Sequence, residues 1–148
     1  MAEVRHSRTI AAEPEAIWGV LADFGSLSAW AAGVEHSCLL YHGDDADPLG
    51  LTRRVQVGRD TFIETIMAFA PPRLLAYDIS GVPRMMSASN RWNLRPDSVG
   101  RTTVTVTSTV QISRRLLRPV TERVAARLMA RRSEALLDSL AKHCEETR

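Results

Sequence analysis

The sequence predicts an α+β domain in which a large, curved antiparallel sheet wraps around one long C-terminal helix. Seven segments with the patterning of strands precede a single helical segment near the C-terminus, and two short helices follow the first strand. No internal repeat, low-complexity tract or Ser/Gly-rich linker divides the 148 residues, so one domain covering residues 1–148 is predicted. The terminal helix of about 25 residues would be nearly 40 Å long at ~1.5 Å per residue, and only a large, bent sheet could cover it.

The first strand and the two short helices are predicted from local signals. Val4–Ile10 alternates as a strand does. Pro14 then stands in the first turn of a helix, between two glutamates that favour the positive end of the helix dipole, and this helix should end near Leu21. Ser26 can cap a second short helix that runs through residues 30–31 before Gly33 ends it.

Six further strands are predicted between the short helices and the last helix, joined by short, turn-like connections. Their bounds are Val34–Tyr41, Gly50–Val57, Thr61–Phe69, Arg73–Ser80, Arg84–Leu94 and Arg101–Ser113.

The last of these strands has the clearest pattern in the chain. Valines and Ile112 share one face while four threonines share the other, as expected for a strand with one face on the core and one in water. Between Val104 and Ile112, Ser108 is the only polar residue on the inner face. After Pro119 the spacing becomes helical to near His143, and six apolar residues form one stripe: Val120, Val124, Leu128, Ala135, Leu136 and Leu140.

The turns at residues 58–60 and 70–72 predict the strand register, because side chains alternate across a sheet with period two. The predicted cross-strand pairs are Val55 with Ile63, Arg53 with Thr65, Thr65 with Tyr77, and Met67 with Leu75. The more apolar face should point inward and carries Leu51, Arg53, Val55, Val57, Ile63, Thr65, Met67, Phe69, Leu75, Tyr77 and Ile79, joined by Trp92 and Leu94. The other face carries Arg54, Gln56, Glu64, Asp78 and Ser80.

This register places five polar side chains on the inner face, namely Arg53, Thr65, Tyr77, Asn90 and Ser108. Burying such a group without a partner costs about 1–3 kcal/mol, and more for a charge, so together they favour a solvated cavity. The alternative is that they lie at the ends of the sheet and reach water.

Composition excludes several classes of protein. The net charge is +2, with 45% hydrophobic and 24% charged residues, so the balance demands neither nucleic acid nor an anionic membrane as partner. Cys38 and Cys144 have no spacing typical of a zinc site or a disulfide framework, and we expect both to be reduced. The N-terminus lacks the apolar run of a signal peptide and no stretch approaches ~18 apolar residues, so a cytoplasmic protein without a membrane span is expected.

The order and local motifs of the chain resemble the START/Bet v 1-like superfamily, often labelled polyketide cyclase/dehydrase and lipid transport proteins, over nearly the whole length. The matching motifs are Thr9-Ile10-Ala11-Ala12 before Pro14, Ile17-Trp18, Leu21-Ala22-Asp23-Phe24, Trp30, Gly50-x-x-Arg53, Pro72-x-x-Leu75-x-Tyr77 and Trp92-x-Leu94-x-Pro96. They mark the fold and contain no catalytic signature. The resemblance implies the helix-grip fold, with a cavity between sheet and C-terminal helix that binds sterols, lipids, hormones, flavonoids or polyketides.

Some members of this superfamily are cyclases or aromatases that carry an arginine on the middle strands, beside aromatic and hydroxyl groups. The centre of the corresponding strand here, residues 64–68, has no arginine. This departure argues against an enzyme, although Arg53 on the neighbouring strand could substitute.

Three other patterns have ordinary structural explanations. His36, Cys38 and His42, followed by aspartates at 44, 45 and 47, lack the second ligand cluster that a metal site needs, so no metal site is predicted. Glu64 and Asp78 should both point outward, with Arg54 opposite Glu64 as a surface ion pair. Arg123, Arg127 and Arg131 form a basic stripe on the last helix that we interpret as a solvated face, because acids are interspersed and no aromatic residue is there to stack bases.

The predicted function is binding or transport of a small hydrophobic molecule, without metal or cofactor, by a monomer or homodimer. The alternatives are a polyketide cyclase or dehydratase that uses the same pocket, and a module that docks on RNA, ribosome or membrane through the basic helix. Arg53 should orient a ligand through a carboxylate, enolate or carbonyl oxygen, because no acidic residue shares its face in the predicted register. The predicted ligand-binding residues are Trp30, Arg53, Thr65, Met67, Tyr77, Asn90, Trp92, Ser108 and Leu128.

Overall fold

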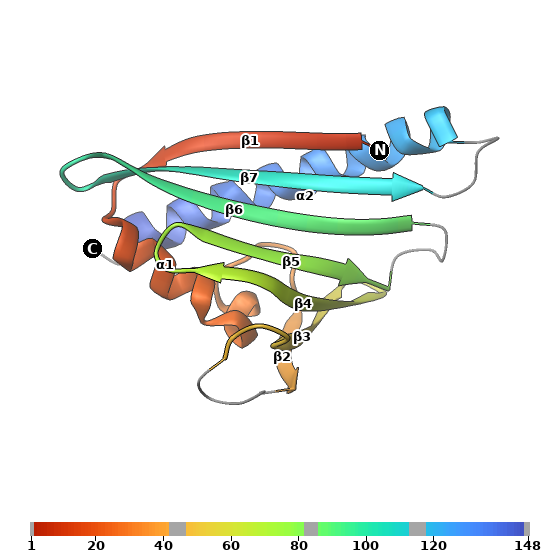
Figure 1. Cartoon of the computed structure of the whole chain (residues 1–148), viewed down its shortest axis with the longest axis horizontal. Helices are drawn as coiled ribbons and strands as arrows, with labels where there is room; N and C mark the ends of the chain where they lie inside the picture. The colour runs from red at the N-terminus through yellow and green to blue at the C-terminus, as the bar shows by residue number, and fades with distance from the viewer. Residues whose placement is uncertain (1, 42–46, 82–85, 113–117, 147–148) are drawn as a thin grey trace.

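One antiparallel sheet, two short helices and one long helix make up the computed structural model, which describes residues 2–41, 47–81, 86–112 and 118–146 (Figure 1). The elements follow the predicted order: β1 (Ala2–Ile10), α1 (Pro14–Ala22), the 3-10 helix η1 (Phe24–Ala29), β2 (His36–Tyr41), β3 (Thr52–Val57), β4 (Asp60–Ala70), β5 (Leu74–Ser80), β6 (Met86–Ser98), β7 (Arg101–Ile112) and α2 (Arg118–Glu146). The predicted helix-grip architecture is therefore confirmed.

The seven strands form a single curved sheet in the order β1-β7-β6-β5-β4-β3-β2. All neighbours are antiparallel, and only β1 pairs out of sequence order, with β7. Helix α2 lies across the inner face beside β1 and β7, and α1 and η1 lie near the C-terminal end of α2 (Figure 1). None of the helices in the described part of the chain is long and apolar enough to cross a membrane.

The short helices differ slightly from the prediction. Pro14 begins α1, as expected from its fixed φ. The second helix begins at Phe24, after Asp23, so Ser26 is not its cap but lies inside it with non-helical dihedral angles. This earlier start buries the ring of Phe24 against the inner face of the sheet.

The core fills the space between the inner face of the sheet and the C-terminal half of α2. Trp92, Leu75 and Val106 are fully buried on the strands, and Leu137 and Leu140 meet them from the helix. Because each fully buried side chain of this size stabilises the fold by about 1.5–3 kcal/mol, these contacts hold helix and sheet together.

The predicted register is wrong for β4. Val57 pairs with Asp60 across a two-residue turn in which Gly58 has φ +61°, so the hairpin is one residue tighter than expected. Arg53 therefore pairs with Glu64 and not with Thr65, and every side chain of this part of β4 is on the other face. A bulge between Ile66 and Ala68 also changes the pairing with β5, so Tyr77 pairs with Ile66 and not with Thr65, and Leu75 pairs with Phe69 and not with Met67, which corrects both predicted pairs. Beyond the bulge Phe69 packs against the core, as predicted.

The predicted apolar stripe on α2 holds only for part of the helix. Leu136 and Leu140 are buried, whereas Val124, Leu128 and Ala135 are exposed, which corrects the prediction for these three. The reason is that α2 packs mainly on β1 and β7, so the sheet covers only the side of the helix turned toward those strands.

Candidate functional site

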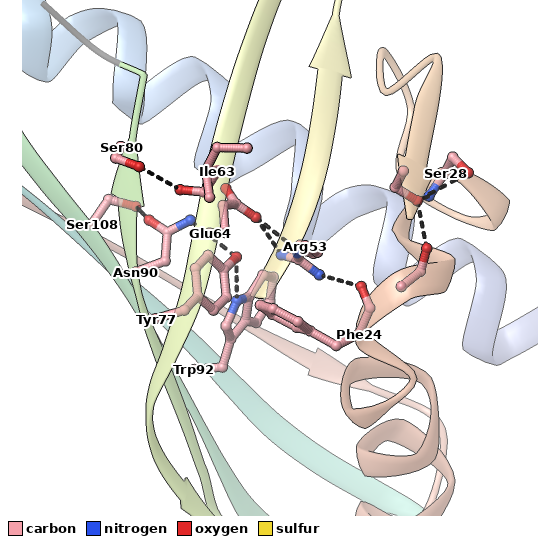
Figure 2. Close-up of polar contacts among 12 residues, drawn as sticks. Phe24, Ser28, Arg53, Ile63, Glu64, Tyr77, Ser80, Asn90, Trp92 and Ser108 are labelled. Atoms are coloured by element: carbon pink, nitrogen blue, oxygen red, sulfur yellow. Dashed lines mark hydrogen bonds and ion pairs between the residues drawn. The ribbon is translucent and has the colours of Figure 1, made fainter. Parts of the chain in front are cut away.

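Buried polar side chains on the inner face of the sheet form one hydrogen-bonded group (Figure 2). Tyr77 on β5 pairs directly with Asn90 on β6, and Trp92 follows on the same face. The amide nitrogen of Asn90 and the indole nitrogen of Trp92 each donate to the hydroxyl oxygen of Tyr77, at 3.2 Å. Both bonds use that oxygen as acceptor, and among the described residues no acceptor takes the hydroxyl's own proton.

This group also connects the sheet to α2. The hydroxyl of Ser108 donates to Oδ1 of Asn90 at 2.6 Å, and it makes a second hydrogen bond with the hydroxyl of Ser133 on the helix. Because Ser108 donates its only hydroxyl hydrogen to Asn90, Ser133 must be the donor in the second bond. The carbonyl oxygen of Asn90 is thus held toward Ser108, which leaves its amide nitrogen turned toward Tyr77.

An ion pair lies beside this group. Arg53 and Glu64 are each only 3% exposed, and Nε and Nη2 of the guanidinium lie 2.7 and 2.6 Å from Oε1 of Glu64. Nη1 of Arg53 donates to the carbonyl oxygen of Phe24 at 3.0 Å. The guanidinium carbon also lies 3.8 Å from the centre of the Phe24 ring and 4.8 Å from that of the Tyr77 ring, so the cation contacts both aromatic rings, which themselves pack edge-to-face (Figure 2).

This ion pair corrects two predictions. Glu64 does not point outward or pair with Arg54, because the tighter turn puts it on the inner face opposite Arg53. It is also wrong that no acidic residue shares the face of Arg53. A role of Arg53 toward a ligand remains a prediction, but each of its three guanidinium nitrogens already has a protein acceptor.

The electrostatics of the site keep Tyr77 protonated. Burial raises the pKa of the Tyr77 hydroxyl, and the nearby Glu64 carboxylate raises it further. The Arg53 guanidinium and the hydrogen bonds from Trp92 and Asn90 act in the opposite direction but do not reverse the shift. At neutral pH the site therefore presents a neutral phenol, which is a hydrogen-bond donor.

Of the nine predicted ligand-binding residues, five lie together on the inner face: Arg53, Tyr77, Asn90, Trp92 and Ser108. Trp30, at the end of η1, is half-buried and packs against the same core.

The other three lie elsewhere, which corrects their expected inward orientation. Thr65 is on the outer face, where its hydroxyl lies 3.3 Å from that of Thr52. Met67 is 57% exposed because it sits in the bulge of β4. Leu128 is 64% exposed on the part of α2 that the sheet does not cover.

The described residues contain no group of three or more His, Cys, Asp or Glu side chains that could hold a metal ion. His36, Cys38 and Asp47 are exposed, while the other members of the suspected cluster, His42, Asp44 and Asp45, lie outside the described residues. The basic stripe of α2 is exposed at Arg123, Arg127 and Arg131, as expected for a solvated helix face.

Sequence reasoning missed Glu64, Phe24 and Ser133 as members of the site. One signal could have identified Glu64: a buried arginine needs a counter-charge, and only a one-residue change of register brings a carboxylate to its face. Phe24 and Ser133 belong to helices, and no local pattern in the sequence indicates which strand residue they contact.

The comparisons with known proteins agree with this fold. A family model described as polyketide cyclase / dehydrase and lipid transport matches residues 1–145. The solved structure of XoxI from Bacillus cereus is 21% identical, with a TM-score of 0.78 over 97% of this chain and 95% of that one. A START superfamily protein from Mycobacterium smegmatis is 18% identical, with a TM-score of 0.76 over 99% of each chain.

The Zhui aromatase/cyclase from Streptomyces sp. R1128 is 22% identical, with a TM-score of 0.78 over 97% of this chain and 93% of that one. At these identities the solved structures show a shared fold. None of the curated proteins matches the sequence.

Proposed function

Since the chain belongs to the polyketide cyclase/dehydrase and lipid transport family, we propose that it binds a small, mostly apolar molecule between the inner face of the sheet and α2. The ligand carries a carbonyl or comparable oxygen that accepts the proton of Tyr77. The apolar remainder packs on partly buried side chains at the edge of the core, such as Trp30 and Ile79, since Trp92 is already covered.

One observation carries this proposal. Tyr77 is buried and neutral, and both hydrogen bonds to its oxygen come from donors, so its proton has no acceptor among the described residues. A buried donor without an acceptor costs about 1–3 kcal/mol, and a ligand oxygen in reach would recover that free energy. Asn90 is positioned by Ser108, and this fixes the direction in which the Tyr77 proton is available.

Arg53 has a supporting role in this proposal. Its guanidinium is neutralised by Glu64 and stacked on Phe24, so it orders the inner face beside Tyr77 and is not the first group to donate hydrogen bonds to a ligand anion. A neutral ligand oxygen therefore suits the site better than a carboxylate, whose charge would also face Glu64.

A matched pair of probes tests the proposal. We expect 2-acetonaphthone, an aromatic ketone, to bind with quenching of tryptophan fluorescence, and Tyr77→Phe to weaken that binding about five- to tenfold, the value of one hydrogen bond of ~1 kcal/mol. The hydrocarbon 2-ethylnaphthalene has nearly the same shape without the oxygen, so its affinity should not change. Thr105→Val, which removes a hydroxyl from the outer face, is the control variant.

Two results would contradict the proposal. Equal loss of both probes in Tyr77→Phe would mean that the substitution only disturbs packing. Unchanged ketone affinity would mean that the hydroxyl does not meet the ligand.

Catalysis is the second candidate, and the two donors on Tyr77 favour it. When a phenol gives up its proton, hydrogen bonds from Asn90 and Trp92 would stabilise the phenolate that remains. Tyr77 could therefore act as general acid, either by protonating the carbonyl oxygen of a bound β-diketone as it enolises or by protonating the hydroxyl that leaves as water from a bound β-hydroxy ketone. Turnover of a poly-β-ketone by the wild type, lost in Tyr77→Phe while ketone binding weakens no more than tenfold, would support it; absence of turnover in the wild type would leave binding as the function.

A further inference from the structure

The outer face of the sheet, opposite the proposed ligand site, contains a hollow of about 660 Å³. Its floor is formed by the outward-facing threonines along β7, including Thr105, Thr107 and Thr109. Side chains of β1, β4, β5 and β6 surround it. Thr107 is only 8% exposed although it faces outward, because its neighbours rise on both sides of it. The hollow is therefore shaped by the long side chains of the flanking strands.

Two arginines stand on either side of Thr107. Arg5 on β1 and Arg91 on β6 both pair with this threonine, so the three residues form one row across the sheet. With strands about 4.8 Å apart, the two arginine backbones are on the order of 10 Å apart, close enough for both guanidinium groups to reach one anion above the threonine. Neither arginine forms an ion pair or hydrogen bond with another described side chain.

The neighbouring row carries the opposite charge. Glu3 pairs with Thr109, Thr109 pairs with Ser89, and Ser89 pairs with Asp78, so the two acids border the same hollow two residues further along the strands. Two residues of a strand correspond to about 6.6 Å. Glu3 and Asp78 are exposed and, within the described part of the chain, have no partner for their carboxylates.

We propose that this hollow binds a small zwitterion with a phosphate at one end and a primary amine at the other. The phosphate lies between Arg5 and Arg91 over the hydroxyl of Thr107, where each guanidinium can donate two parallel hydrogen bonds. The ammonium lies toward Glu3 and Asp78. A phosphate without the amine would be repelled by these carboxylates, and an amine without the phosphate by the arginines, so the two rows together select a zwitterion.

The test is a titration of the ¹⁵N-labelled protein with phosphorylethanolamine, followed by amide chemical shifts. We expect saturable shifts at Thr107 and Thr109, at least tenfold weaker binding in Arg91→Gln, and unchanged binding in Arg95→Gln. Arg95 is the matched control because it is exposed on the same strand and the same face but does not line the hollow. Arg91 is exposed, so its replacement should leave the circular dichroism spectrum unchanged.

Three further arms define the ligand. Inorganic phosphate and ethanolamine should each bind at least tenfold more weakly than phosphorylethanolamine, and equal binding of phosphate would overturn the selection of a zwitterion. Co-sedimentation of the protein with vesicles of phosphatidylethanolamine and phosphatidylglycerol, but not with vesicles of phosphatidylglycerol alone, would support a lipid headgroup as the ligand of the site. Binding of free phosphorylethanolamine without binding to the vesicles would support a soluble ligand. The proposal is overturned if neither free phosphorylethanolamine nor the phosphatidylethanolamine headgroup shifts the amide signal of Thr107. This outcome does not depend on the ketone-binding experiments at Tyr77.

Discussion

Replacing Glu64 with glutamine should destabilise the protein more than most single substitutions. The change keeps the shape of the side chain but removes the charge that neutralises Arg53. Arg53 is 3% exposed, and a guanidinium stays protonated at any ordinary pH, so it would be left as a buried, uncompensated charge.

The expected loss in the free energy of unfolding is about 3–5 kcal/mol, the range for breaking one buried ion pair from one side. A domain of ordinary stability has about 5–15 kcal/mol, so the variant should still fold but unfold at a clearly lower urea concentration. In the variant, Arg53 keeps its hydrogen bond to the carbonyl oxygen of Phe24 and its stacking on the Phe24 ring. These contacts favour a loss near the lower end of the range. Urea denaturation followed by circular dichroism measures the loss.

Two companion variants make this prediction falsifiable. Asp138→Asn breaks the exposed ion pair with Arg8, at 2.7 Å, and should cost less than about 1 kcal/mol. The double substitution Arg53→Met with Glu64→Leu removes both charges and should recover most of the stability lost in Glu64→Gln. If Glu64→Gln costs no more than Asp138→Asn, water reaches the pair and the buried site described above is wrong.

Two further predictions concern the core and the thiols. Leu140→Ala, at a fully buried position of α2, should reduce the free energy of unfolding by about 2–5 kcal/mol in the same urea assay, and a loss under 1 kcal/mol would show that helix and sheet are not tightly packed there. Iodoacetamide at pH 8 should label the native protein once, at exposed Cys38. Cys144 should not react, because burial and the charge of Glu145 raise its pKa from 9.0 to about 11. Mass spectrometry counts the adducts. Since the folded state keeps the Cys144 proton above pH 9 while the unfolded chain loses it, stability should fall between about pH 9 and 11, and a Cys144→Ser variant should lack that part of the fall.

The sequence was sufficient for the fold because its signals are regular and repeated. The alternation in the last strand predicts which side chains of β7 face the core, and the observed burial of Val104, Val106 and Val110 confirms it. The same reasoning places Tyr77, Asn90 and Ser108 correctly on the inner face, since β5, β6 and β7 pair without irregularity between them at these positions.

The membership of the site was harder to predict because one turn residue changes a whole strand. A three-residue turn and a two-residue turn at Gly58 are both compatible with the sequence, and they differ by one residue in register. That difference moves Glu64 to the inner face and Thr65 to the outer face. Beyond the bulge near Met67 the predicted and observed faces of β4 agree again, as at Phe69. The predicted burial of helix residues such as Leu128 was wrong for a different reason. An apolar stripe indicates a helix face but not how much of that face the sheet covers.

The pairing of β1 with β7 has a consequence for how the protein is made. Ala2 pairs with Val110 and Ile10 with Thr102, so β1 has no neighbour in the sheet until β7, about a hundred residues further along the chain, has left the ribosome. At about 5–20 residues per second, synthesis of the intervening hundred residues takes roughly 5–20 s. During this interval β1 has neither its partner strand β7 nor α2 to pack against, so its backbone hydrogen-bonding groups and the side chain of Ile10, fully buried in the folded protein, stay exposed until β7 emerges.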